Sequence, residues 1–98
     1  MVEGARSETE NIMKDVAPAY LERKRADVSR YRQYLASGDL ESIRVLGHQM
    51  KGTGAGYGFP ALTDFGSAIE AAAGRGDHAL LAGKVEELAT YLSSMEST

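Results

Sequence analysis

Residues 39–60 read DLESIRVLGHQMKGTGAGYGFP, and this stretch indicates most clearly how the chain folds. Its apolar residues recur at the three- and four-residue spacings of one helical face, which carries Ile43, Leu46, Met50 and Tyr57. Asp39 opens the stretch as a helix cap. Gly58-Phe59-Pro60 closes it, because the residue before a proline is pushed away from helical angles. The stretch therefore predicts an amphipathic helix with one buried face.

Periodic apolar residues predict three more helices around this one. The helix before it is expected to begin near Pro18, because the missing N–H of proline has no intrahelical partner in a first turn. Ser37-Gly38 ends that helix, and Gly74-Arg75-Gly76-Asp77 separates the third helix from the fourth. The predicted core faces are Ala17, Leu21, Val28, Tyr31 and Leu35 in the first helix, Leu62, Phe65, Ile69 and Ala72 in the third, and Leu81, Val85, Leu88, Leu92 and Met95 in the fourth.

These segments predict an all-α fold, an antiparallel up-down-up-down four-helix bundle. The connections between the helices are very short, and no stretch alternates apolar and polar residues with the period of a strand. Residues 1–7 are expected to form a flexible tail and residues 8–98 the helical domain. The segment Glu8–Val16 is compatible with a short extra helix ahead of the bundle.

Length, composition and charge exclude several classes of function. With 98 residues, 43% of them hydrophobic, the chain fits one domain with one modest core and has no room for a separate nucleotide-binding domain. It has no cysteine, so it has neither a disulfide nor a thiolate zinc site. The net charge of −3 argues against general nucleic-acid binding. No apolar run approaches the length of a membrane span, and we expect a cytoplasmic monomer.

The second predicted helix contains an unusual density of glycine. Five glycines fall within twelve residues, and each interior glycine destabilises a helix by about 0.5–1 kcal/mol relative to alanine. Close packing of a neighbouring helix explains Gly47 and Gly54, which lie toward the apolar side of the helix. It does not explain Gly52, which lies toward the polar side. The glycines of this cluster are Gly47, Gly52, Gly54, Gly56 and Gly58.

His48 lies opposite the apolar face of this helix. At 100° per residue, the four apolar residues fall within about 40° of the pole opposite His48, so its imidazole points to solvent. Lys51 follows one turn later, and Gly52 and Ala55 leave small side chains nearby. A neutral imidazole is abundant near pH 7 and can attack phosphorus. An exposed histidine, a cation and a side chain removed at Gly52 together indicate a phosphoryl acceptor that a second protein approaches.

The pattern His48-x-x-Lys51-Gly52 followed by Gly58 resembles the signature of histidine-containing phosphotransfer (HPt) domains. The continuation Phe59-Pro60-Ala61-Leu62 and the later Ile69-Glu70 are also similar to that family. The resemblance implies that His48 carries the phosphoryl group on the ring nitrogen remote from the backbone. It also implies that Lys51 stabilises the phosphate and that Gly52 gives the partner access.

The same resemblance implies a phosphoryl carrier that is not an enzyme and has no cofactor of its own. The partners would be receiver domains of response regulators or hybrid histidine kinases, and the receiver would supply the Mg²⁺ and the aspartate. Asp39, Asp64 and Asp77 are read as caps or solvated residues and not as a magnesium cluster. Either direction of transfer, and either a free-standing protein or a domain of a hybrid kinase, fits these residues. The expected receiver-binding residues are Arg44, Val45, Gln49 and Ala55.

Three other interpretations compete with the carrier. The phosphoacceptor domain of sensor kinases has an acidic residue after its histidine and a proline a few positions on, where this chain has Gln49 and Thr53. The glycine run lacks the spacing of a nucleotide-binding loop. A helical adaptor that binds a signalling partner without chemistry stays open as an alternative. A basic stretch on the first helix is expected to be a solvated face, with a lesser role in steering an acidic partner; it comprises Arg23, Lys24, Arg25, Arg30 and Arg32.

Overall fold

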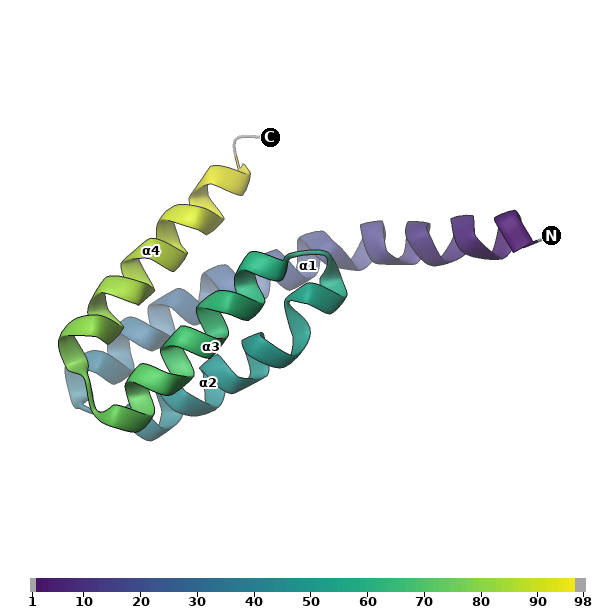
Figure 1. Cartoon of the computed structure of the whole chain (residues 1–98). Helices are drawn as coiled ribbons and strands as arrows, with labels where there is room; N and C mark the ends of the chain where they lie inside the picture. Colours follow the sequence, from purple (N-terminus) through teal and green to yellow (C-terminus); the bar gives the residue numbers. More distant parts are fainter. Residues whose placement is uncertain (1, 97–98) are drawn as a thin grey trace.

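The computed structural model describes the backbone of residues 2–96 and the side chains of residues 16–95. Within residues 2–96 the chain forms four α-helices and one short 3₁₀ turn, and no strand (Figure 1). The helices alternate in direction and are joined by short turns, which confirms the antiparallel four-helix bundle. The elements are α1 (Val2–Ser37), α2 (Leu40–Thr53), η1 (Ala55–Tyr57), α3 (Pro60–Arg75) and α4 (His78–Glu96).

The first helix differs from its prediction. One continuous helix runs from Val2 to Ser37, with Pro18 inside it and not in a first turn, so no separate helix precedes the bundle. An interior proline lacks one backbone donor, and its ring crowds the carbonyl four residues earlier. The turns on both sides of the exposed Pro18 are nevertheless helical. The division into a tail over residues 1–7 and a domain over residues 8–98 stays a prediction. Met1 and the side chains of residues 2–15 lie outside the described part of the chain.

The helix ends follow from local chemistry. Gly38 and Gly76 take positive φ angles of 74° and 69° after α1 and α3, a conformation in which glycine avoids the strain of a Cβ. Asp39 caps α2 by accepting a hydrogen bond from the Ser42 backbone N–H at 3.1 Å. Asp77 accepts one in the same way from the Leu80 N–H at the start of α4. The expected caps are therefore confirmed.

The core joins apolar residues from all four helices. The predicted faces of α3 and α4 are confirmed at Leu62, Ile69 and Ala72 and at Leu81, Val85, Leu88 and Leu92, which are buried. Phe65 and Met95, predicted on the same faces, are only partly buried. Tyr57 is a correction: α2 ends at Thr53, and Tyr57 belongs to η1, where its ring stacks on that of Tyr20 with centroids 4.2 Å apart. Glycine-rich backbone lets the chain leave the helix before Tyr57. The remaining buried apolar residues are Tyr20, Val28, Tyr31, Ile43, Met50 and Ala73.

Helices α2 and α3 pack against each other most closely, because glycines stand where they meet. A Cβ placed on Gly54 would lie 2.6 Å from the Thr63 nitrogen, and one placed on Gly66 would clash with the Lys51 nitrogen. A Cβ on Gly47 would lie 3.0 Å from the Glu70 nitrogen. This confirms the packing role predicted for Gly47 and Gly54 and fixes α3 beside the polar face of α2.

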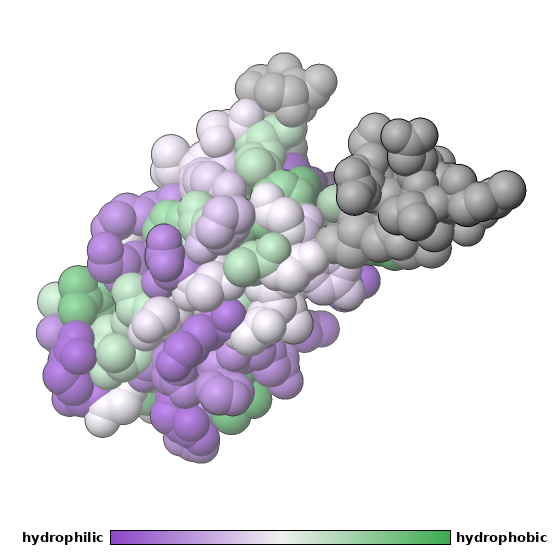
Figure 2. All heavy atoms as spheres, turned by 45° about the vertical axis from the view of Figure 1, so that its right-hand side comes forward, coloured by the Kyte–Doolittle hydropathy of each residue, from purple (hydrophilic) through white to green (hydrophobic). Residues whose placement is uncertain are grey.

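Outside the core, the surface is mixed in character. On the face shown in Figure 2, apolar side chains occur in small groups between polar ones. Three large apolar residues of the described chain are exposed, namely Val16, Val45 and Leu80. No helix among the described residues is long and apolar enough to cross a membrane.

Candidate functional site

His48 stands on the outer face of α2, as its spacing predicted. Its side chain is 68% exposed, whereas Ile43, Gly47 and Met50 of the same helix are buried. The imidazole therefore neither fills the core nor lies under another helix. It is open to a group that approaches from solvent.

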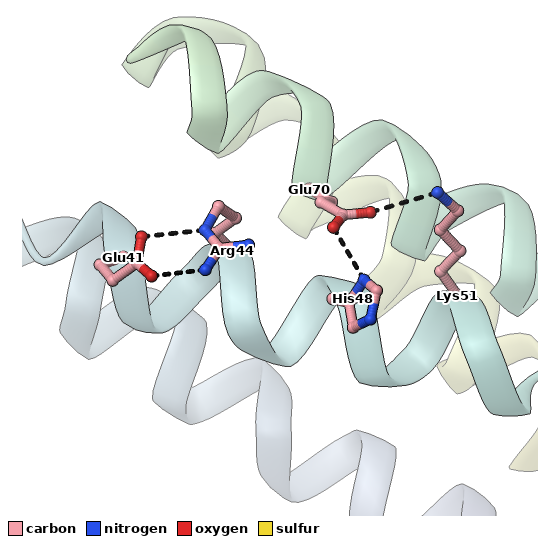
Figure 3. A network of polar contacts seen from close by, with 5 residues as sticks. All are labelled: Glu41, Arg44, His48, Lys51 and Glu70. Carbon is pink, nitrogen blue, oxygen red and sulfur yellow. Dashed lines mark hydrogen bonds and ion pairs between the residues drawn. The ribbon is translucent and has the colours of Figure 1, made fainter.

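Glu70 of α3 holds both polar residues of the predicted site (Figure 3). One of its carboxylate oxygens lies 2.8 Å from Nδ1 of His48, and the other lies 3.3 Å from Nζ of Lys51. The hydrogen bond with His48 lowers the pKa of the Glu70 carboxyl most strongly; the bond from Lys51 lowers it further, and desolvation opposes both. Glu70 is thus an anionic acceptor shared by an imidazole and an ammonium group.

The Glu70 contact determines which nitrogen of His48 can react. A carboxylate only accepts hydrogen bonds, so Nδ1 carries the ring proton in this pair. In the neutral ring, Nε2 then keeps its lone pair. Among the described residues nothing forms a hydrogen bond with Nε2, which lies on the far side of the ring from Glu70 (Figure 3). The arrangement presents a nucleophilic nitrogen to solvent and fixes the ring that carries it.

The space around Gly52, next to His48 on the outer face of α2, is empty. A Cβ at this position would meet nothing within 4 Å, in contrast to the crowded Gly47 and Gly54. Ala55 is exposed in η1, and its N–H donates to Oγ1 of Thr63 at 2.9 Å. The small residues predicted around His48 therefore do leave the ring uncovered.

The predicted docking residues surround His48 on α2 and η1. Val45 is 40% exposed and Gln49 is exposed beside it. Arg44 forms two hydrogen bonds with the Glu41 carboxylate, so its charge is partly neutralised (Figure 3). Their role in binding a receiver stays a prediction.

The basic stretch of α1 is not a uniformly solvated face, and that expectation is wrong for one residue. Lys24 is buried, with 8% of its surface exposed, and its ammonium lies 3.1 Å from Asp27, which is also buried. Asp27 lies three residues after Lys24 on the same helix, and its carboxylate compensates the buried positive charge. Three other cations of the stretch also have carboxylate partners; the pairs are Arg25–Glu22, Arg30–Asp27 and Arg32–Glu86.

Glu70 is the site residue to which sequence reasoning assigned no role. It appeared only as part of a family likeness, and its spacing of 22 residues from His48 has no local meaning. The close contact of α2 and α3 at Gly47 and Gly66 brings the two side chains together. Within the described residues, no group of three or more His, Asp, Glu or Cys side chains could hold a metal ion.

Comparison with known protein families agrees with this geometry. The family model described as the Hpt domain matches residues 15–98. The chain belongs to the Hpt domain family. Hpt domains act in histidine phosphotransfer in phosphorelays, as phosphocarrier modules that interact with receiver domains and not as kinases. No curated protein and no solved structure matches the chain significantly.

Proposed function

We propose that this Hpt domain accepts a phosphoryl group on Nε2 of His48 from a receiver aspartate and passes it to another receiver. The observation that carries the proposal is the exposed Nε2 on a ring whose Nδ1 is held by Glu70 at 2.8 Å. Family membership supplies the reaction class, and the geometry supports His48 as the acceptor.

In the proposed transfer, the lone pair of Nε2 attacks phosphorus in line with the aspartyl oxygen. The Nε2–P bond forms as the P–O bond breaks, and the bonding electrons of the P–O bond leave with the aspartate carboxylate. The proton on Nδ1 stays in place, so the phosphorylated ring carries a positive charge. The Glu70 carboxylate faces that charge and stabilises it. Transfer to the next receiver reverses these bonds.

Lys51 and Gly52 serve the incoming group in this proposal. The Lys51 ammonium lies one helical turn from His48 and can turn from Glu70 to the phosphoryl oxygens, whose two or so negative charges attract it. Gly52 leaves the approach open, since a side chain there would project into the space beside the ring. The receiver supplies the Mg²⁺ that neutralises the transferring group.

The test mixes the protein with a ³²P-phosphorylated receiver domain and Mg²⁺ and follows the label. We expect label on the wild-type chain that is labile in acid and stable in alkali, as a phosphohistidine is. His48→Gln should accept none, while His78→Gln, which alters the other histidine of the chain, should accept it normally. Retained labelling of His48→Gln would refute the proposal, and an unlabelled wild type that still binds the receiver would favour the adaptor. Incubation with labelled ATP alone should leave the chain unlabelled.

A further inference from the structure

We infer that the receiver docks on the α1 side of His48, where the groove between α1 and α2 accepts an acidic side chain of the receiver through Lys24, Arg23 and Arg30. This inference rests on the proposed function, because it takes the partner to be a receiver domain. It adds the side from which the receiver approaches and the groups of this chain that hold it.

The two sides of His48 can be separated by helical geometry. At about 100° per residue, Gly52, Val45 and Gln49 lie about 40°, 60° and 100° to one side of His48. On the other side, Lys51 contacts Glu70 of α3, and Gly47 packs on the α3 backbone. The α3 side is therefore occupied. The open space at Gly52 and the exposed Val45 both lie on the α1 side.

A groove follows this open side between α1 and α2. One part has a volume of about 250 Å³ and is lined by Arg23, Lys24, Ala26, Asp27, Arg30, Leu46 and Gln49. A second part of about 210 Å³ continues past Leu46 and is lined by Tyr34, Glu41, Ser42 and Val45 as well. Gln49, the neighbour of His48, forms part of the wall. A protein seated in this groove would reach the imidazole.

The larger part of the groove has an excess of positive charge. The Lys24 side chain is only 10% exposed; its ammonium bonds Asp27 and lies 5.1 Å from the centre of the Tyr20 ring. An ammonium has three donors, so Lys24 can still donate to an acceptor that enters the groove. Arg23 lies at the rim, 5.8 Å from the same ring, and Arg30 is 61% exposed. Three cations against the single Asp27 favour a carboxylate as the entering group.

The other hollows of the described surface fit an acidic receiver less well. Between α3 and α4, two hollows share Phe65, and their polar lining includes Asp64, Glu86, Glu87 and one cation, Lys84. Carboxylates there would repel the aspartates that a receiver gathers around its Mg²⁺ site. These hollows also lie on helices that do not carry His48. A further hollow between α1 and α4 is lined by two cations, Arg25 and Arg32, but it too lies away from α2. Charge complementarity together with the position of His48 therefore selects the α1–α2 groove.

The first test maps binding directly. The probe is the receiver domain that exchanges label fastest in the assay above, titrated unphosphorylated into ¹⁵N-labelled protein. We expect the amide resonances of Arg23, Lys24, Leu46 and Gln49 to shift, and those of Phe65 and Tyr91 to stay in place. Shifts centred on α3 and α4, or no binding by any receiver, would overturn the inference.

The second test measures function with a charge-matched control. Arg23→Glu combined with Arg30→Glu should slow transfer from the receiver about tenfold or more at low salt, because attraction between opposite charges accelerates association by that order. The control combines Arg75→Glu at the end of α3 with Lys84→Glu on α4. It changes the net charge by the same amount outside the groove and should change the rate little. Equal slowing by the groove variant and the control would contradict the docking site.

Phosphoramidate separates docking from chemistry, because this small donor phosphorylates histidine with release of ammonia and needs no docking surface. The groove variant should react with phosphoramidate at the wild-type rate, and loss of that reaction would show that the two changes damage His48 itself. A receiver that binds the groove but never phosphorylates His48 would refute the proposed function and leave the docking site standing.

Discussion

The glycines of α2 and of its C-cap occupy two opposite environments. Gly47 and Gly54 lie against α3, where a Cβ would press on the Glu70 and Thr63 backbone, whereas Gly52 borders only open space. In sequence all three weaken the helix equally. In the fold, the first two bring α3, and with it Glu70, close to His48, and the third keeps the opposite side clear. The comparison teaches that one residue type both builds this site and leaves it accessible.

The largest expected effect is on stability and comes from a change where α2 and α3 pack together. Gly66→Ala, which contacts α2 from α3, forces a methyl group against the Lys51 backbone, and overpacking of this kind destabilises a fold by about 1–3 kcal/mol. Gly52→Ala adds the same methyl in open space and should stabilise the helix by up to about 0.5–1 kcal/mol. Urea unfolding of both variants measures the two signs. A Gly66→Ala variant as stable as Gly52→Ala would contradict the packing account.

The next effect is on phosphoryl transfer and comes from filling the open space at Gly52. Gly52→Leu should slow transfer from a phosphorylated receiver by about tenfold, which corresponds to roughly 1.4 kcal/mol in the barrier, because the side chain fills the approach to His48. The matched control is Gly83→Leu on α4, which is also an exposed helical glycine with nothing within 4 Å of its Cβ position. Stopped-flow measurement of both variants decides the point. If they slow transfer equally, Gly52 has no special role in access.

The smallest effect concerns the Glu70 contact and is read from its pH dependence. Hydrogen bonds from His48 and Lys51 hold the pKa of Glu70 below its ordinary value of 4.5. A carboxyl whose pKa is lowered by folding stabilises the fold above its unfolded pKa and loses that contribution as pH falls through the folded pKa. The stability difference between wild type and Glu70→Gln should therefore shrink as the pH falls below 4.5.

Urea unfolding from pH 7 to pH 3 measures this difference. The control repeats the pair of proteins in a His48→Ala background, where the main cause of the lowered pKa is absent and the pH-dependent part should shrink. A difference between wild type and Glu70→Gln that does not vary with pH would show that the carboxylate is not held by these partners.

Much of the fold could be predicted from local patterns. Apolar periodicity located the buried faces of α3 and α4, and the caps at Asp39 and Asp77 marked helix starts, because both depend only on neighbours in sequence. The exposure of His48 followed from the same periodicity. Pro18 gave a wrong start for α1, since the helix continues through this residue despite the missing backbone donor and the crowding by the proline ring.

The remaining features depend on contacts between helices. Glu70 reaches His48 only because α3 packs closely on α2. The spacing of the two residues along the chain does not predict that contact. Lys24 was expected to be solvent-exposed because it is charged. In the fold its ammonium pairs with Asp27 and lies against the Tyr20 ring. Tertiary packing decided each of these cases, and periodicity does not report it.

The position of the phosphoryl group on His48 tests the central claim most directly. The protein is labelled with ¹⁵N in its histidines and phosphorylated from a receiver domain, and coupling between ³¹P and the ring nitrogens is recorded by NMR. We predict that phosphorus couples to Nε2 of His48, with Nδ1 still protonated against Glu70. Phosphorus on Nδ1, on His78 or on no histidine at all would contradict the account.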